Sequence, residues 1–388
     1  MRLTLSEEQA LIESSVQDFL AAEYSFAQRA RSLQAAHGCS PEIWQQFAAM
    51  GWLALLLPES DAGAGAGTLE AGLVMRAFGR HLVVEPYAAS ALLATPLLAG
   101  HGRPEQRDQW QAALVEGRVR AALAHEERGA PLPWLQRRTV ARRSAAGWLL
   151  SGSKQLVPGA AGADLLLVSA QVPDQDGSEQ RLFLLSPRHS GLRITPAMTS
   201  DGSHVADLVF DDVRLANGDL LGADTDATPL LLQACARHLV ALCWEASGAM
   251  AAVHEQTVGY LRQRVQFGQP LSQFQVVAHR LAEMAVACEE ALAACQLAAL
   301  RIDAGAPDPM SLASMAKSKV GRESRFVAQQ AVQLHGAMGV SQELPVASYF
   351  RKLTAFGQQG GSHAAHSQAF GAAMLQNQGW RDSRTLGA

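Results

Sequence analysis

An arginine, an aromatic ring and two side-chain amides stand at the ends of long apolar stretches in the C-terminal part of the chain. Arg264, Phe267 and Gly268 form an Arg-x-x-Phe-Gly sequence. Gln275 follows seven residues after that glycine, and the segment Gln333–Gly336 comes much later. A guanidinium can fork onto phosphate oxygens, and an aromatic ring can pack against a flat heterocycle. These residue types therefore suit a site for a large, flat, phosphorylated cofactor.

The same residues also have an ordinary structural explanation. Gly268 could cap the end of a helix, and Ser272 with Gln275 has the spacing of a capping box at the start of the next helix. Gly336 could likewise be a helix C-cap, and Arg264 could lie on a solvated helix face. Spacing alone does not decide between a cofactor site and these helix ends.

Several segments together resemble the acyl-CoA dehydrogenase family of flavoproteins. Arg264–Gly268, Gln275 and Gln333–Gly336 are similar to the family's flavin-binding signature. Other family-like segments lie earlier in the chain: Met50–Glu59, Ala77–Pro86, Ser151–Lys154 and Ala163–Val168. The similarity runs from about residue 5 to residue 378. It implies FAD as the cofactor, an acyl-CoA thioester as the substrate and an electron-transfer flavoprotein as the electron acceptor.

Composition narrows the class of protein. The chain has 388 residues, of which 48% are hydrophobic and 18% are charged, so it can form two or three domains with a sizeable core. A formal net charge of −4 and the lack of a long basic run argue against nucleic-acid binding. No signal peptide or membrane-spanning apolar run is recognisable, and the five cysteines show no metal or disulfide spacing. We therefore expect a cytoplasmic protein with reduced thiols, no metal site and no membrane span.

The first part of the chain, residues 1–117, is expected to be a helical domain. Ser6 and Gln9 have the spacing of a capping box, and apolar residues then recur at helical intervals. Further helices are predicted over 42–50, 69–79, 88–98 and 106–114. The glycine–alanine run at 61–67 lacks the flanking strand and lysine-bearing helix start of a phosphate-binding loop, so we expect a plain flexible loop there.

Residues 118–225 have a different sequence pattern, in which short runs of strand-forming residues alternate with turn residues. The predicted strands are 120–124, 148–150, 165–172, 180–186 and 203–213. The segment 172–178 has the composition of a hairpin turn. This pattern predicts a small antiparallel β-barrel or sandwich as the middle domain.

Residues 226–388 return to helical periodicity. Helices are predicted over about 228–264, 273–304, 308–336 and 345–374, the last broken by Gly357, Gly360 and Gly361. Long antiparallel helices with few charges on one side predict a C-terminal four-helix bundle, and their remaining apolar faces predict an oligomer. The expected fold class is therefore α+β and mostly α.

The resemblance also assigns roles to individual residues of the cofactor site. It places Arg264 at the cofactor pyrophosphate of a neighbouring subunit, with Phe267 and Gln275 in the adenine-side pocket. Across the same subunit boundary it places Gln333, His335 and Gly336 beside the phosphates or the ribityl chain. Ser362 falls where the family often has a hydroxyl that contacts the flavin.

The catalytic carboxylate of the family is missing from both of its usual positions. In the turn that follows Arg351, the chain has Gly360–Ser362 in its place. At the alternative position, on the first long bundle helix, it has Arg237 and His238. Glu245 lies two turns further along that helix, about 10 Å away at 1.5 Å per residue, which is too far for the same role. His238 is the one candidate base, since an imidazole pKa is near neutral.

The middle domain departs from the family as well. His125 stands where a threonine often bonds the flavin, and Leu156–Gly159 replaces a Trp-Ile-Thr/Ser turn that covers the flavin ring. Backbone atoms of Pro158 could still contact the ring. This style of turn, together with the histidines at 363 and 366, resembles members that act in paired-subunit enzymes.

Three functions remain open from the sequence. The first is FAD-dependent α,β-dehydrogenation of an acyl-CoA thioester by a homo-oligomer. The second is a partner subunit without a base, which binds FAD and stabilises a catalytic sister chain. The third is oxidation of a non-thioester substrate on the same scaffold, because fold alone does not fix the reaction.

Overall fold

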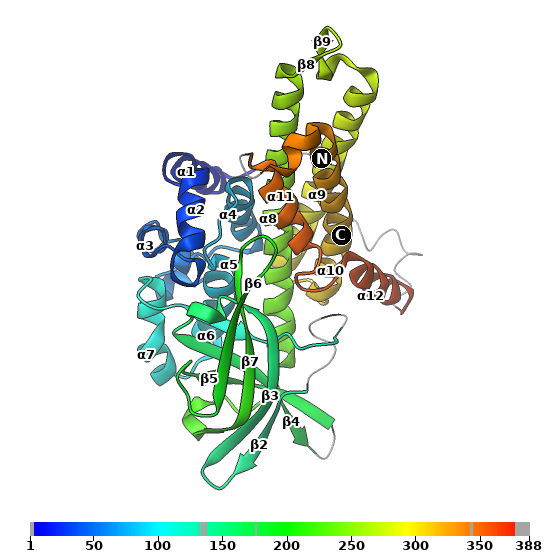
Figure 1. The fold of residues 1–388 in the computed structure, drawn as a ribbon. Helices are drawn as coiled ribbons and strands as arrows, with labels where there is room; N and C mark the ends of the chain where they lie inside the picture. The colour runs from blue at the N-terminus through cyan, green and yellow to red at the C-terminus, as the bar shows by residue number, and fades with distance from the viewer. Residues whose placement is uncertain (1–3, 131, 133–137, 175–176, 342–343, 377–388) are drawn as a thin grey trace. The chain divides into compact units, whose positions relative to one another are not determined.

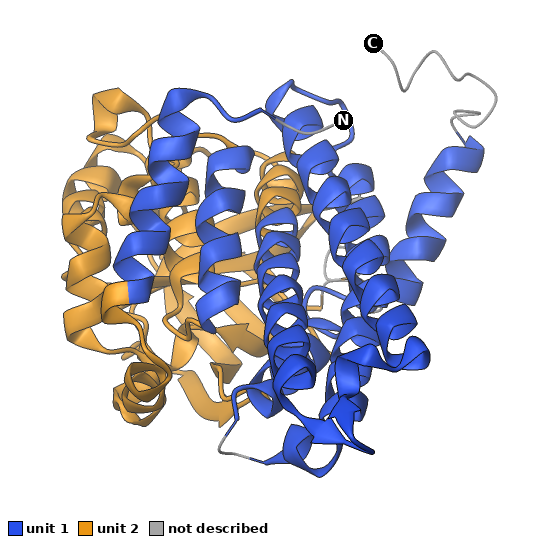
Figure 2. Ribbon diagram, turned by 90° about the horizontal axis from the view of Figure 1, so that it is seen from above, with its two compact units in different colours: residues 1–21, 68–82, 239–388 blue, residues 22–67, 83–238 orange. Residues whose placement is uncertain are grey.

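The computed structural model describes residues 4–130, 132, 138–174, 177–341 and 344–376. The chain forms two compact units (Figure 2): unit 1 comprises residues 1–21, 68–82 and 239–388, and unit 2 comprises residues 22–67 and 83–238. Each unit therefore draws on more than one of the predicted sequence domains. The expected boundaries near residues 117 and 225 fall between secondary-structure elements, because β1 begins at Ala121 and α8 at Thr228.

The helices that lie wholly in unit 2 are short, and two of them begin at a capping serine. They are α2 (Phe26–Gln34), α3 (Pro41–Ala49), α5 (Tyr87–Ala89), α6 (Thr95–His101) and α7 (Pro104–Val115). The side chain of Ser25 accepts the N–H of Gln28, and the side chain of Ser40 accepts the N–H of Ile43. Proline, whose missing N–H is unneeded in the first turn, opens α3 and α7.

The helix predicted over 88–98 forms as three successive segments. A π-helical turn, Ser90–Ala94, separates α5 from α6. Pro96 lies in the first turn of α6 and cannot donate the backbone hydrogen bond that a continuous α-helix requires there. A π-turn before the proline is a local way to keep the chain helical across that gap.

The middle of unit 2 is a seven-stranded, mostly antiparallel sheet. Its strands are β1 (Ala121–Ala124), β2 (Val140–Ser144), β3 (Gly147–Pro158), β4 (Leu165–Asp174), β5 (Gly177–Leu185), β6 (Leu192–Met198) and β7 (His204–Leu215). β1 and β2 pair with β4 in parallel, whereas the other pairings are antiparallel. The predicted hairpin at 172–178 is confirmed by the pairing of Asp174 with Gly177; residues 175–176 of that turn lie outside the described part.

Strand β4 forms the centre of unit 2 because both of its faces are buried. Leu166 and Val168 belong to the apolar cluster that also holds Trp148 and Phe183. Leu165 and Leu167 face the opposite cluster, which includes side chains of α6 and α7. A continuous apolar run of this kind is typical of a strand covered on both sides.

The helices of unit 1 include the longest in the described part of the chain, and some of them start at a capping side chain. They are α1 (Glu7–Glu23), α4 (Thr68–His81), α8 (Thr228–Gln263), α9 (Gln275–Asp303), α10 (Pro309–His335), α11 (Val346–Phe356) and α12 (His363–Gln376), with α1 and α8 extending into unit 2 (Figure 1). The Ser6–Gln9 capping box is confirmed, with hydrogen bonds of 3.0 and 3.2 Å in the two directions. Asp308 accepts the N–H of Ser311 at 2.9 Å and so caps α10.

Two glycines allow the backbones of α4 and α8 to touch within unit 1. A Cβ atom on Gly79 would lie 1.8 Å from the Glu245 carbonyl oxygen, and one on Gly248 would lie 1.9 Å from the Arg76 carbonyl oxygen. Any larger residue at either position would force the helices apart. The predicted fold class, mostly helical with a curled central sheet, is confirmed. None of the described helices has the length and apolar character needed to cross a membrane.

Candidate functional site

A small β-hairpin joins α8 to α9 at the Arg-x-x-Phe-Gly sequence (Figure 1). Strands β8 (Val265–Gln266) and β9 (Gln269–Pro270) pair across a turn formed by Phe267 and Gly268. Both turn residues have positive φ, +52° for Phe267 and +83° for Gly268. Positive φ at both central residues is the mark of a type I′ turn, and a phenylalanine in the first position is strained there.

The hairpin corrects the helix-end explanation drawn from the sequence. α8 ends at Gln263, before the hairpin, so Gly268 is a turn residue and not a helix C-cap. α9 begins after Phe274, where no side-chain cap bond forms. The expected capping box between Ser272 and Gln275 is therefore absent, because Gln275 is itself the first residue of the helix.

The tip of the hairpin is exposed. The side chain of Phe267 is 90% exposed, and its ring meets the ring of Phe274 edge-on at 6.2 Å. Arg264 and Gln275 are exposed as well. The arginine, the ring and the amide thus stand together around one projecting turn, where they can contact a ligand or another chain.

At the C-terminal end of α10, the residues of the Gln333–Gly336 motif face different environments. Gln333 and Gly336 are exposed. Gly336 ends the helix with φ +60° and ψ −138°, a conformation that is essentially restricted to glycine. His335 faces inward, where its ring stacks on Tyr260 at 4.4 Å and its Nδ1 donates to the Ala331 carbonyl at 2.9 Å. Burial lowers the pKa of His335. His335 and Gln333 therefore do not share one surface.

Ser362 is the N-cap of α12. Its Oγ accepts the N–H of Ala365 at 3.2 Å. The preceding Gly360 and Gly361 have φ values of +64° and +105°. A Cβ atom on Gly360 would lie 2.9 Å from Leu239 Cδ1. Both backbone conformation and packing thus oppose a side chain at the position where the resemblance expects the catalytic carboxylate.

His238 on α8 is a weak base in this environment. It is half-buried, and among the described residues its Nδ1 has no hydrogen-bond partner. Burial lowers the pKa of His238 to about 4, although a backbone hydrogen bond at Ala88 opposes the change. The imidazole is therefore neutral near pH 7, but its low pKa makes proton abstraction less favourable than for an ordinary histidine.

Glu245, the nearest carboxylate along α8, is held in an ion pair. It is buried, and its Oε1 lies 2.7 Å from Nζ of Lys352 on α11. A buried carboxylate held by an ammonium group is stabilised in its charged form. It is therefore unsuited to accept a proton, in addition to lying two turns away from the expected position.

His125 belongs to a buried polar network in unit 2. Its Nδ1 lies 2.8 Å from Ser169 Oγ. Nζ of the buried Lys154 lies 3.2 Å from the same Oγ and 2.7 Å from Oε1 of Glu127. Burial raises the pKa of Glu127, but the Lys154 charge and hydrogen bonds outweigh this effect, so that the pKa is lowered. His125 is thus part of a charged network immediately after β1.

Sequence reasoning missed the pairing of Lys154 with Glu127. The signal was present in β3, where Trp148 and Leu150 face the core at intervals of two residues. Continuing that alternation places Lys154 on the same inward face. A lysine on the buried face of a strand requires a buried anionic or polar partner.

The segment after Lys154 contains a bulge. The register of β3 against β7 shifts between Lys154 and Val157, and Leu156 has φ +51° and a side chain that is 47% exposed. The N–H of Leu156 is held by Asp207 Oδ1 at 2.8 Å. Pro158 ends the strand and pairs with Val205. The bulge therefore turns Leu156 outward at the position where the resemblance has the flavin-covering tryptophan.

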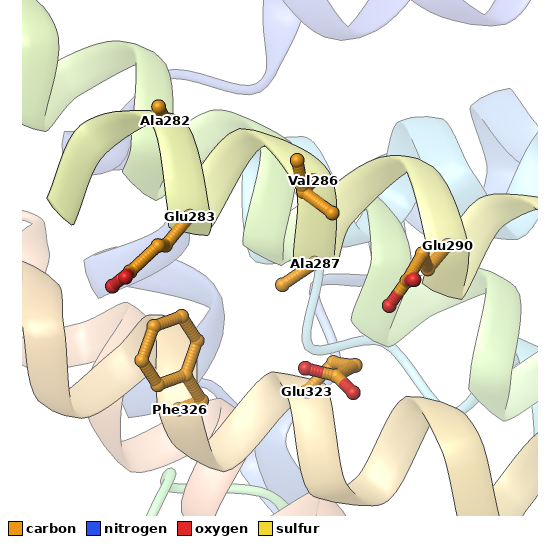
Figure 3. Close-up of a pocket in the computed structure, with 7 residues that line it drawn as sticks. All are labelled: Ala282, Glu283, Val286, Ala287, Glu290, Glu323 and Phe326. Atoms are coloured by element: carbon orange, nitrogen blue, oxygen red, sulfur yellow. The ribbon is translucent and has the colours of Figure 1, made fainter. Parts of the chain in front are cut away.

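Two grooves lie on the helices of unit 1. One, of about 330 Å³, runs between α9 and α10 and contains Glu283, Glu290 and Glu323 (Figure 3). Lys319 forms ion pairs with Glu290 and Glu323 and lowers the pKa of Glu290, so Glu290 is a poor base. The other groove, of about 650 Å³, lies between α10 and α12 and is lined by basic side chains that include Lys319 and Arg322.

Comparison with known proteins decides the family. Residues 6–118 match the acyl-CoA dehydrogenase N-terminal domain, and residues 233–381 match the acyl-CoA dehydrogenase C-terminal domain. Acyl-CoA dehydrogenase FadE28 of Mycobacterium tuberculosis is 31% identical over 312 residues, which cover 80% of this chain and 86% of that protein. This chain belongs to the acyl-CoA dehydrogenase family.

Solved structures agree with this membership. The steroid ACAD Tcur3481-Tcur3483 has a TM-score of 0.87 and 28% identity, and the match covers 97% of this chain and 100% of that one. The ChsE4-ChsE5 complex from Mycobacterium tuberculosis has a TM-score of 0.86 and 24% identity, with 97% and 99% of the two chains covered. At that identity the second likeness shows the fold alone.

As a member of the acyl-CoA dehydrogenase family, this chain is an FAD-type flavoprotein, as its sequence predicted. The residues present fit a phosphorylated, flat cofactor at one place in unit 1. An exposed guanidinium stands beside an aromatic ring that is 90% exposed despite a strained backbone. Strain of this kind persists where function requires the geometry. The flavin, when bound, supplies the redox chemistry.

Proposed function

We propose that this chain is the partner subunit without a base in a heteromeric acyl-CoA dehydrogenase. The assembly would carry out FAD-dependent α,β-dehydrogenation of an acyl-CoA thioester. The observation that carries this proposal is Gly360, whose positive φ and contact with the Leu239 side chain disfavour a residue that carries a carboxylate. The catalytic carboxylate would then belong to a sister chain.

The state of the other candidates supports the same conclusion. Glu245 is paired with Lys352, and burial makes His238 a weak base. The matched structure of the ChsE4-ChsE5 complex provides a precedent for this fold in a two-protein assembly.

The cofactor residues would act in two groups. Arg264, Phe267 and Gln275 on the hairpin would hold the FAD of a neighbouring chain, with the guanidinium on the pyrophosphate. The exposed end of α10 (Gln333, His335 and Gly336 in the sequence prediction) would approach the same cofactor. In this structure His335 would do so indirectly, since its ring packs on Tyr260.

The second group would serve the flavin of the chain itself. In unit 2 it comprises His125 and Pro158. Lys154 and Glu127 would hold His125 in place through Ser169 and the local backbone. Electrons would leave for an electron-transfer flavoprotein.

A second candidate function is dehydrogenation by this chain alone, as a homo-oligomer with His238 as the base. The observation that favours it is the buried Nδ1 of His238, which has no hydrogen-bond partner among the described residues. A lone pair in that state could accept a substrate proton.

An anaerobic titration distinguishes the two functions. The purified protein would be mixed with short, long, branched and steroid-side-chain acyl-CoA thioesters while the visible flavin band is followed. We expect bound flavin that no thioester bleaches, and bleaching once a sister chain carrying the glutamate is added. Bleaching by the chain alone, and its loss in His238→Ala, would establish the second function instead.

A further inference from the structure

The loop between α11 and α12 is held at both ends by one turn of α10. At its start, Nζ of the buried Lys317 donates to the Phe356 carbonyl and lies 3.4 Å from the centre of the Phe356 ring. Near its end, the Gly360 carbonyl accepts from Nε2 of His366 at 2.8 Å. His366 Nδ1 in turn lies 3.1 Å from Ser314 Oγ. Ser314 and Lys317 are three residues apart and therefore lie on one face of α10.

The hydrogen bonds fix the proton positions on His366. A carbonyl oxygen can only accept, so Nε2 carries the proton, and in the neutral ring Nδ1 accepts from the Ser314 hydroxyl. The histidine is completely buried and both of its ring nitrogens are bonded. Burial, with the nearby charge of Lys317, lowers its pKa to about 4. The neutral, doubly bonded form is therefore the one present near neutral pH.

Packing against the neighbouring helices restricts the conformation of the loop. Gly360 is in the left-handed region against Leu239 of α8. Gly321 of α10 lies against His363, since a Cβ atom there would be 2.8 Å from the His363 Cβ. The loop is thus enclosed by α8, α10 and α12, and it delivers Ser362 as the cap of α12.

We propose that His366 is a positioning residue, which together with Ser314 clamps the Gly360 carbonyl and thereby orients Ser362 toward the cofactor. The cofactor part of this inference rests on the proposed function, whereas the clamp itself rests only on the contacts within unit 1.

Hydrogen–deuterium exchange of the peptide that spans 357–363 tests the clamp. His366→Leu removes both hydrogen bonds, and we expect exchange in that peptide to rise on the order of tenfold, the effect of a lost buried hydrogen bond. His366→Gln should restore slow exchange, because its amide N–H can donate to the Gly360 carbonyl. Ser367→Ala is the matched control, because Ser367 is exposed beside His366 on the same helix and lies outside the measured peptide; it should leave exchange unchanged.

The affinity for FAD and the spectrum of bound FAD, measured in the same variants, test the cofactor role. We expect weaker FAD binding and a shifted flavin band in His366→Leu, both recovered in His366→Gln. If His366→Leu does not fold, Ser314→Ala should raise loop exchange in the same direction by a smaller factor.

The outcomes separate the two ideas. Unchanged exchange in a folded His366→Leu or Ser314→Ala protein overturns the clamp. Faster exchange with unchanged FAD affinity and spectrum overturns the positioning role. A wild-type protein that binds no FAD overturns the proposed function and the cofactor role together, while the exchange experiment still reports on the clamp.

Discussion

Single residues decide where chemistry is possible in this member of the acyl-CoA dehydrogenase family. At Gly360 the backbone conformation and the packing both favour glycine. Its φ is positive, and a Cβ atom there would crowd the Leu239 side chain. At Glu245 the carboxylate is present but paired with Lys352. A glutamate in the sequence therefore does not by itself identify a catalytic base.

This view predicts that the carboxylate cannot be restored by one substitution. Gly360→Glu should lower the free energy of unfolding by about 1–3 kcal/mol, since it places a side chain at positive φ and against Leu239. It should give no flavin bleaching with acyl-CoA. Chemical denaturation and anaerobic titration measure the two effects. Gly360→Ala is the control, because it adds the Cβ atom without the acid and should destabilise similarly. A stable Gly360→Glu protein that bleaches its flavin would contradict the prediction.

At the scale of helices and strands, the parts of the fold that could be predicted are those fixed by residues close together in the sequence. The capping residues Ser6 and Asp308 give helix starts that the structure confirms, because a cap involves only neighbours within one turn. Strands β2 and β6 were missed: the sequence Val-Ala-Arg-Arg-Ser of β2 and the largely exposed β6 lack a continuous apolar face. β2 and β6 form because they pair with β3 and β7, respectively. Pairing between two strands is not visible in the sequence of either strand alone.

The candidate site divides in the same way. The exposed residues of the hairpin were predicted as a group from their resemblance to the family's flavin-binding signature, although the type I′ turn was not, since phenylalanine is rare where φ is positive. The contacts of Lys154 with Glu127 and of His366 with Ser314 join residues 27 and 52 positions apart. Contacts of this kind cannot be predicted from the residue pattern of a single helix or strand.

The hairpin leads to a prediction in which stability and function change in opposite directions. Phe267→Asn should raise the free energy of unfolding by roughly 0.5–1 kcal/mol, because Asn-Gly suits a type I′ turn and relieves the strain. The same change should reduce the flavin content, since the exposed ring is lost. Denaturation curves and the flavin-to-protein ratio report the two results. Val265→Thr, in the same ribbon, should alter neither, and a Phe267→Asn protein that keeps its flavin would remove the ring from the cofactor site.

Burial of His366 predicts how stability depends on pH. Its pKa is about 4 in the folded protein against 6.5 ordinarily, so between these values the unfolded chain binds more protons. Stability should therefore be complete above about pH 6.5 and fall as the pH drops toward 4, by up to about 3 kcal/mol for this group. His366→Gln should show a smaller fall over that interval in parallel denaturation series. Equal slopes in the two proteins would mean that His366 is not protonated on unfolding.

At the scale of the whole molecule, the residues that we propose to bind or position the cofactor are split between the interior and the surface. His125 and His366 are buried and fixed by their own chain, whereas the Arg264 side chain and the Phe267 ring are exposed. Groups of the first kind suit a ligand held by this chain, and groups of the second kind suit a ligand presented by another. The division is therefore consistent with a cofactor site completed only on assembly.

Arg264→Ala tests that arrangement. The arginine is exposed, so its removal should leave the thermal stability of the chain without flavin unchanged. Loss of a charge-assisted bond to a pyrophosphate, about 1.5–3 kcal/mol, should weaken FAD binding roughly tenfold to a hundredfold. Arg262→Ala, at an exposed position two residues earlier, is the matched control and should bind FAD normally.

Mixed assemblies of Arg264→Ala chains with Ser362→Ala chains test the subunit boundary. If Arg264 acts on the FAD of a neighbouring chain while Ser362 acts on the FAD of its own chain, a mixed pair contains one site with both side chains, and FAD titration should recover a class of site with wild-type affinity. If both residues act on the FAD of their own chain, every site lacks one side chain and no site of wild-type affinity should appear.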